Sequence, residues 1–228
     1  MAKKIVKRKK LRVFRLLIVL IVLGGLFFGG YLFVKIPIKN IIVKNNTYIN
    51  DDYVLELSGL KDYPAFLLYN SFKGVKKLEK SPYINDAKIK KRFFNKIVIE
   101  IVENKPLFYS EYDKKIVFSN KESIDVDDYS KFRVPRLLNY VPNTKYKSFI
   151  KKVDKIDEEI LGKISDIEYV PNELDKDRFL LYMDDGNMVY LTLTKFNMIN
   201  YYNDVLSQLE GKKGILYLDN GNHFQIKE

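Results

Sequence analysis

The sequence contains no cysteine and a single histidine, His223. Disulfides are therefore excluded, and each folded domain must be held together by its hydrophobic core. Zinc sites and histidine-based catalytic triads need more thiol or imidazole groups than this chain has. Acid-rich calcium loops and glycine-rich phosphate loops are also absent. We therefore expect no metal site and no cofactor, and we interpret His223 as an ordinary strand residue.

Tryptophan is missing as well, but other aromatic residues are plentiful, with 17 Tyr and 15 Phe. A chain so rich in apolar and aromatic residues is not a disordered stalk, because it can bury enough surface to fold. Its 228 residues are enough for one large or two small domains.

Acidic residues are absent from the first 15 residues, which carry eight Lys and Arg. These eight account for most of the net charge of +11, so the rest of the chain carries only +3. A nearly balanced body lacks the basic footprint that nucleic-acid binding requires, and we expect no nucleic-acid partner. The basic segment is instead typical of the cytoplasmic flank of a membrane helix, where it would also attract anionic lipid headgroups.

Charge and proline are absent from residues 16–34, LLIVLIVLGGLFFGGYLFV. As an α-helix this segment is about 28 Å long, close to the ~30 Å hydrocarbon thickness of a bilayer. No Ala-x-Ala cleavage site follows, which favours a permanent anchor over a signal peptide. We predict a cytoplasmic tail at 1–15, a single transmembrane helix at 16–34 and a body outside the cytoplasm. A body without disulfides is more typical of a bacterial envelope protein than of a eukaryotic ectodomain.

Residues 36–105 carry the pattern of a compact α+β unit. Asn50 is a candidate helix cap and Gly59 a helix stop, with the apolar face of a short helix between them. The complete pattern is a strand at 38–46, the capped helix, a helix at 68–80 with Phe72, Val75 and Leu78 as its apolar face, a strand at 85–92, a turn at 93–95 and a strand at 96–103. The predicted order is therefore β-α-α-β-β.

Residues 106–228 are predicted to form a second, β-rich domain. Asp184–Asn187 and Asp219–Asn222 are strong hairpin turn signals. We expect strands at 107–109, 115–118, 163–170, 179–183, 188–193, 215–218 and 223–226, with helices at 145–160 and from Thr194 to Leu209, and an irregular stretch up to Pro142. The fold class is α+β, with a C-terminal hairpin at the edge of the second domain.

Two short motifs have a functional interpretation beside an ordinary one. Ser148 and Lys151 match the S-x-x-K of penicillin-binding enzymes, but the Ser-Asp-Asn and Lys-Thr-Gly motifs of that class are missing. A Lys-rich helix produces such a match easily, so we expect no enzyme and keep a membrane-anchored cell-wall enzyme as an alternative. Gly25 and Gly29 form a GxxxG pattern that either packs against another membrane helix or faces lipid.

Several segments together resemble the FtsQ family of bacterial division proteins, called DivIB in Gram-positive organisms. The residues that carry this resemblance are 38–46 (IKNIIVKNN), 81–84 (SPYI), 98–106 (VIEIVENKP) and 213–224 (KGILYLDNGNHF). Residues 118–124 depart from it, because they lack the Asp and Gly that the family usually has there. The first exported unit is similar to the family's POTRA domain.

The resemblance implies a non-catalytic scaffold of the division machinery at the septum. Such proteins bind the bitopic coiled-coil proteins FtsL and FtsB/DivIC outside the membrane, and so act indirectly on the septal peptidoglycan synthases. The main contact of the family lies in the last part of the β domain. Another POTRA-bearing assembly or transport factor is the alternative.

The C-terminal hairpin has a physical basis for that contact. A sheet edge exposes unpaired N–H and C=O groups that can accept a further strand. The candidate partner-binding residues are Ile215, Leu216, Tyr217, Leu218 and Phe224. Side chains alternate along a strand, so Ile215 and Tyr217 share one face and Leu216 and Leu218 the other, and either face could point outward.

Overall fold

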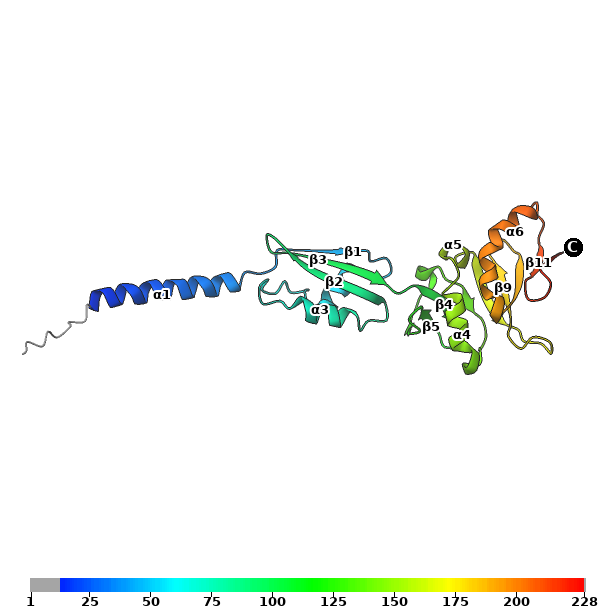
Figure 1. Cartoon of the computed structure of the whole chain (residues 1–228), viewed down its shortest axis with the longest axis horizontal. Helices are drawn as coiled ribbons and strands as arrows, with labels where there is room; N and C mark the ends of the chain where they lie inside the picture. Colours follow the sequence, from blue (N-terminus) through cyan, green and yellow to red (C-terminus); the bar gives the residue numbers. More distant parts are fainter. Residues whose placement is uncertain (1–12, 228) are drawn as a thin grey trace, which may run out of the picture.

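The computed structural model describes residues 13–227 of the chain. An N-terminal helix, a three-stranded sheet with two helices and a nine-stranded sheet follow one another in an elongated arrangement, with the C-terminus at the end far from the first helix (Figure 1). Most of the predicted tail, residues 1–12, lies outside the described part.

Helix α1 (Val13–Val34) contains the whole predicted anchor. It is long and apolar enough to cross a membrane, and its side chains from Phe14 to Val34 are exposed. A helix that is hydrophobic on all sides and is not buried by any other part of residues 13–227 fits a lipid environment.

The first folded unit has the predicted β-α-α-β-β order. Its elements are β1 (Asn40–Lys44), α2 (Asp51–Ser58), α3 (Ser71–Leu78), β2 (Ile84–Arg92) and β3 (Lys96–Glu103). Strand β3 lies in the middle of the sheet, parallel to β1 and antiparallel to β2. A parallel β1–β3 pair needs a long crossover, and α2 and α3 lie within that crossover. Ile97, Ile99 and Ile101 of β3 are fully buried in the core that the sheet and helices share.

Local capping explains where the two helices begin and end. The side chain of Asn50 accepts a hydrogen bond from the backbone N–H of Tyr53, and Gly59 ends α2 with a left-handed φ of 73°. Both predicted signals are confirmed. Helix α3 is shorter than the predicted 68–80, because the Asn70 side chain caps it by accepting from Lys73 N. Phe72 is exposed, so the prediction that it belongs to the buried face was wrong.

The second unit is built on one mixed sheet with the order β12-β11-β10-β9-β8-β7-β4-β5-β6. Its elements are β4 (Pro106–Ser110), β5 (Lys115–Phe118), β6 (Ser123–Asp125), η1 (Ser130–Phe132), β7 (Arg136–Leu137), α4 (Asn143–Val153), α5 (Glu158–Leu161), β8 (Ile164–Tyr169), β9 (Arg178–Met183), β10 (Met188–Thr192), η2 (Leu193–Tyr201), α6 (Tyr202–Gln208), β11 (Gly214–Tyr217) and β12 (His223–Ile226). Both predicted hairpins, β9–β10 and β11–β12, are present. The predicted irregular stretch contains β6, η1 and β7.

Two predicted helices are each divided in two. The segment 145–160 forms α4 and α5, because a tight turn in which Ile156 N donates to Val153 O ends α4. Glu158 and Glu159 then lie in the first turn of α5, where the helix dipole favours acids. The segment from Thr194 to Leu209 forms the 3-10 helix η2 and then α6. Thr192 rather than Thr194 precedes η2, and its side chain makes no capping bond.

Aromatic rings hold the helices of the second unit to its sheet. Phe149 of α4 stacks on Phe179 of β9 with ring centroids 4.9 Å apart. Phe196 of η2 meets the edge of both rings, at 5.7 and 5.4 Å. All three side chains are fully buried, which makes them the centre of the core that supports the C-terminal strands.

The two units also contact each other directly. The Glu103 carboxylate at the end of β3 accepts hydrogen bonds from the backbone N–H groups of Thr47, Tyr48 and Ile49. Tyr48 in turn stacks on Phe132 of the second unit at 5.6 Å. Glu103 therefore fixes a loop of the first unit against an aromatic ring of the second.

Candidate interaction surface

The C-terminal hairpin is the outermost part of the nine-stranded sheet. Strand β11 pairs in parallel with β10 and antiparallel with β12, so its backbone is bonded on both sides. Strand β12 pairs with β11 alone and forms the edge of the sheet. The open backbone groups of the hairpin therefore belong to residues 223–226, whereas residues 214–217 are interior.

The hairpin places its two sets of side chains on different faces. Leu216 and Leu218 are buried in the core, and Phe224, opposite Leu216, packs against it while half-buried. Ile215 and Tyr217 are half-buried on the other face. Tyr217 stacks between Tyr190, at 5.3 Å, and the exposed ring of His223, at 4.6 Å. The five residues singled out from the sequence thus lie in one hairpin, on both of its faces.

The pairing pattern shows which β12 residues turn their backbone outward. Lys227 N donates to Lys213 O at 3.0 Å, so this pair is a hydrogen-bonded one. Hydrogen-bonded and non-hydrogen-bonded pairs alternate in an antiparallel ladder. Gln225 and His223 are therefore bonded to β11, and Phe224 and Ile226 direct their N–H and C=O groups to the open edge. An added strand would bond to these two residues.

A groove borders β12 on each face of the sheet. One groove, of about 390 Å³, lies beside η2 and α6 and is largely apolar. It is lined by Met198, Tyr201, Val205, Leu209, Leu218 and Phe224 among others. The other, of about 480 Å³, is more polar and is lined by Leu174, Arg178, Tyr217, Asp219 and His223 among others. A strand added to β12 would find a pocket on either side for its alternating side chains.

A largely buried ion pair fixes the turn that precedes β12. Arg178 Nε donates to the Asp219 carboxylate at 2.7 Å, and the side chains are only 18% and 9% exposed. The same guanidinium lies 3.6 Å above the Tyr190 ring centroid. Arg178 and Tyr190 lie on neighbouring strands, and together they hold the turn of the hairpin against the sheet.

A hydrogen-bond network fixes the start of β11. The buried Asn187 side chain donates to the Tyr202 hydroxyl at 3.0 Å and accepts from Gly214 N at 2.8 Å. Tyr202 donates to Asp185 at 2.7 Å. Burial of Asp185 works against its ionisation, but bonds from Asn187 and Tyr202 outweigh it and lower the pKa of the carboxyl. Burial, followed by the bond to Asp185, raises the pKa of Tyr202.

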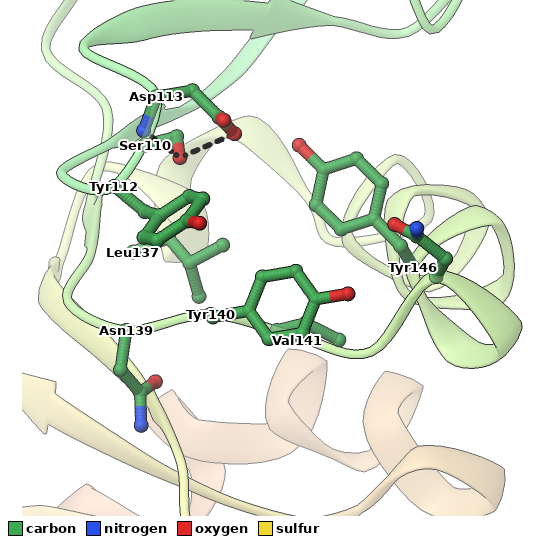
Figure 2. Close-up of a pocket in the computed structure, with 9 residues that line it drawn as sticks. Ser110, Tyr112, Asp113, Leu137, Asn139, Tyr140, Val141 and Tyr146 are labelled. Carbon is green, nitrogen blue, oxygen red and sulfur yellow. Dashed lines mark hydrogen bonds between the residues drawn. The ribbon is translucent and has the colours of Figure 1, made fainter.

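A further cavity, of about 400 Å³, lies at the end of β4. Tyr112, Tyr140 and Tyr146 surround it, and Ser110 bonds to Asp113 at its rim (Figure 2). Asp113 N also donates to Ser110 Oγ, which makes this an ordinary turn contact. Burial raises the pKa of Tyr146 to about 12, so its phenol stays protonated at neutral pH. The residues that line this cavity include neither a His nor a Lys beside Ser110.

Other candidates from the sequence lie apart from the hairpin. Ser148 and Lys151 are exposed on the outer side of α4. Gly25 and Gly29 are exposed on α1, with no atom near enough to contact an added Cβ. Within residues 13–227 there is no cluster of His, Asp and Glu that could hold a metal ion.

Sequence reasoning missed Arg178, Tyr190 and Asn187, which position the hairpin. Their partners Asp219, Tyr217 and Gly214 are 41, 27 and 27 residues away in the chain. Local periodicity carries no information about such pairs. Two of these residues gave a local signal, Asn187 in the Asp184–Asn187 turn and Asp219 in the Asp219–Asn222 turn, but neither turn indicated the distant partner.

An N-terminal apolar helix, a β-α-α-β-β unit and a β-rich unit with an open C-terminal edge define a POTRA-bearing protein. The family model "POTRA domain, FtsQ-type" matches residues 36–104. The chain is 31% identical to the cell division protein DivIB of Bacillus anthracis, over 81% of this chain and 71% of that protein. It is 28% identical to DivIB of Bacillus subtilis, over 97% and 88%. The chain belongs to the DivIB family of cell division proteins.

A solved structure is also similar. It is the major extracytoplasmic domain of DivIB from Geobacillus stearothermophilus, which is 20% identical. The match has a TM-score of 0.38 and covers 48% of this chain and 96% of that one. The family assignment rests on the sequence matches above.

Proposed function

We propose that this member of the DivIB family is a non-catalytic scaffold of the division machinery. In this proposal α1 crosses the membrane once, with the basic tail at 1–15 in the cytoplasm and the units at 36–105 and 106–228 outside. The eight cations and no acid before the helix support that orientation. The partners are bitopic coiled-coil proteins of the FtsL and FtsB/DivIC kinds, and through them the septal peptidoglycan synthases.

The open edge of β12 is the observation that carries the partner-binding part of the proposal. The outward N–H and C=O groups of Phe224 and Ile226 would bond to an added partner strand, and the two bordering grooves would select its side chains. Bonds to a backbone edge give affinity for any strand, so specificity comes from the grooves. The ion pair of Arg178 with Asp219 keeps the edge in a fixed position, which reduces the ordering cost of binding.

Ile226→Pro tests this proposal without disturbing the hairpin itself. Proline removes the outward N–H of residue 226, whereas the bonds between β11 and β12 use residues 223, 225 and 227. The purified full chain is titrated with the extracytoplasmic segments of its FtsL-like and DivIC-like proteins. We expect I226P to bind about tenfold more weakly and the matched control I226T, which keeps the N–H, to bind as the unmodified chain does. Equal binding by I226P and I226T would exclude strand addition at β12.

The cellular part of the proposal has a separate test. A fluorescent fusion to the N-terminus leaves the β12 edge free. We expect it to concentrate at the division septum, and I226P to lose that concentration. A uniform envelope signal in dividing cells would instead indicate a POTRA-bearing factor of another process.

A further inference from the structure

The end of the first unit that adjoins α1 exposes an unusual set of apolar side chains. The turn between β2 and β3 and the loop between α2 and α3 both lie at this end (Figure 1). Phe93 and Phe94 at the turn are 91% and 94% exposed. We call the following exposed residues the aromatic end: Tyr63, Leu67, Leu68, Phe72, Phe93 and Phe94.

Hydrogen bonds tie both loops to the few residues that follow α1. Phe66 N donates to Ile36 O at 2.9 Å, and Ile38 N donates to Pro64 O at 3.0 Å. Lys39 N donates to Asn95 O at 2.9 Å, which fixes the β2–β3 turn. Lys91 Nζ then connects the two loops by donating to Phe66 O at 2.6 Å. The aromatic end is therefore one connected surface beside the exit of α1.

The length of the connecting chain keeps this surface close to the bilayer. Ile36 is two residues beyond the end of α1, and an extended chain covers at most ~3.5 Å per residue. The headgroup layer on each side of the hydrocarbon is about 6 Å thick. A loop bonded to Ile36 thus lies in or next to that layer if α1 spans the membrane.

The backbone at the aromatic end gives no stability reason for its aromatic residues. Phe94 and Tyr63 have left-handed φ angles of 62° and 47°, which bulky side chains rarely adopt. Neither ring is buried, so the fold gains no core packing in return. Aromatic rings at such positions are typical of residues retained for contact with something outside the chain.

The charge distribution identifies an anionic surface as that contact. Segments 35–39, 60–73 and 89–97 hold eight cations and one acid, Asp62, a net charge of +7. Two of these cations form ion pairs with acids outside the segments, Lys61 with Glu56 and Lys90 with Glu100, and the other six remain for an anionic surface. The part of the chain after α1 carries +3 in total, so the remainder of it carries −4. The cations of the three segments are Lys35, Lys39, Lys61, Lys73, Lys90, Lys91, Arg92 and Lys96. Basic residues beside exposed aromatic rings are the pattern of a protein surface that lies on anionic phospholipid.

We propose that the aromatic end binds the outer surface of the bilayer that α1 spans. Phe93 and Phe94 enter the region between the headgroups and the upper acyl chains, and the surrounding Lys and Arg side chains contact lipid phosphates. This contact holds the first unit against the membrane and fixes the direction in which the rest of the chain points. The inference rests on the proposed membrane anchoring of α1.

The absence of tryptophan makes the test direct, because a single introduced tryptophan is the only one present. The full chain is reconstituted into vesicles of equimolar phosphatidylcholine and phosphatidylglycerol. In one preparation the phosphatidylcholine is brominated near the headgroup end of its acyl chains, so that it quenches nearby tryptophan. F93W reports on the aromatic end. L174W is the matched control, because Leu174 is 95% exposed in the second unit. F27W reports on α1.

We expect brominated lipid to remove most of the emission of F93W and F27W and to leave that of L174W unchanged. Replacing phosphatidylglycerol by phosphatidylcholine, or adding Lys39→Gln and Arg92→Gln to F93W, should reduce the quenching of F93W. Emission of F93W that is quenched no more than that of L174W, while F27W is quenched, would overturn the proposal and leave the anchoring intact. Unquenched F27W would overturn the anchoring and this inference with it.

Discussion

Tyr202 donates its hydroxyl hydrogen to the Asp185 carboxylate across 2.7 Å, which connects α6 to the turn between β9 and β10. The same hydroxyl accepts from Asn187, whose side chain also bonds to the first residue of β11. One phenol thus joins three elements that are separate in the chain. The position of the C-terminal hairpin depends on it.

Tyr202→Phe should therefore loosen β11 while leaving the hydrophobic core filled. The change removes a bond to a charged acceptor and leaves the buried Asn187 amide without one partner, which costs about 2 kcal/mol. We expect the free energy of local opening, measured by amide hydrogen exchange at Leu216, to fall by about that amount. Tyr201→Phe is the control, because Tyr201 is exposed. Equal protection in both variants would show that the network does not support the hairpin.

The stability of this region should also fall in acid. The pKa of Asp185 is lowered in the folded chain from the usual 3.8, so the folded state binds its proton less readily than the unfolded state. Its stabilising contribution is complete above the unfolded pKa and is lost as the pH falls through the lower folded pKa. We expect the exchange protection of β11 to decline below about pH 4. The difference between the unmodified chain and Y202F should shrink over the same range, and a constant difference would contradict this account.

Gly214→Ala should displace β12 from β11. A Cβ at position 214 would lie 2.1 Å from Gln225 O and 2.8 Å from Phe224 Cζ, which is closer than atoms can approach. Overpacking of this kind costs ~1–3 kcal/mol, and here the obstacle is a backbone oxygen that cannot rotate away. We expect faster exchange at Gln225 and weaker partner binding. Gly162→Ala is the control, because its nearest neighbour is 3.5 Å away and should tolerate the methyl group.

Glu103→Ala should release the loop between β1 and α2. Three backbone N–H groups, of Thr47, Tyr48 and Ile49, lose their acceptor, and each unsatisfied donor that stays buried costs ~1–3 kcal/mol. We expect faster amide exchange at Tyr48 and Ile49, together with weaker packing of Tyr48 on Phe132. Glu122→Ala is the control, because Glu122 is exposed and, among the described residues, its carboxylate accepts a bond only from the Asn120 side chain. Unchanged protection at Ile49 would mean that water replaces the carboxylate.

Regular patterns made the first unit predictable from the sequence. The alternation of Ile97, Ile99 and Ile101 predicted a strand at 96–103, and Asn50 and Gly59 marked the ends of α2. These signals act over a few residues and depend on backbone geometry that any fold must respect. The same holds for the turns of the two hairpins in the second unit.

Contacts between distant residues were beyond the reach of such patterns. The pairing of β10 with β11 is parallel and is separated by η2 and α6, so nothing local reveals that β11 is interior and β12 is the edge. The exposed position of Phe72 and the ion pair of Arg178 with Asp219 likewise depend on tertiary structure. The C-terminal hairpin could be located from the sequence, but its open backbone groups could not.

If α1 spans the membrane, the elongated arrangement of the chain sets the distance between the membrane and the edge of β12 (Figure 1). The edge of β12 lies at the end opposite α1, with both folded units between them. If β12 receives the partner strand, a partner anchored in the same membrane must present that strand well above its own membrane helix. A rigid rod as long as the two units meets this requirement, and a short tethered peptide does not. The length of the fold would then select partners whose binding strand lies at the matching distance from the membrane, independently of side-chain recognition.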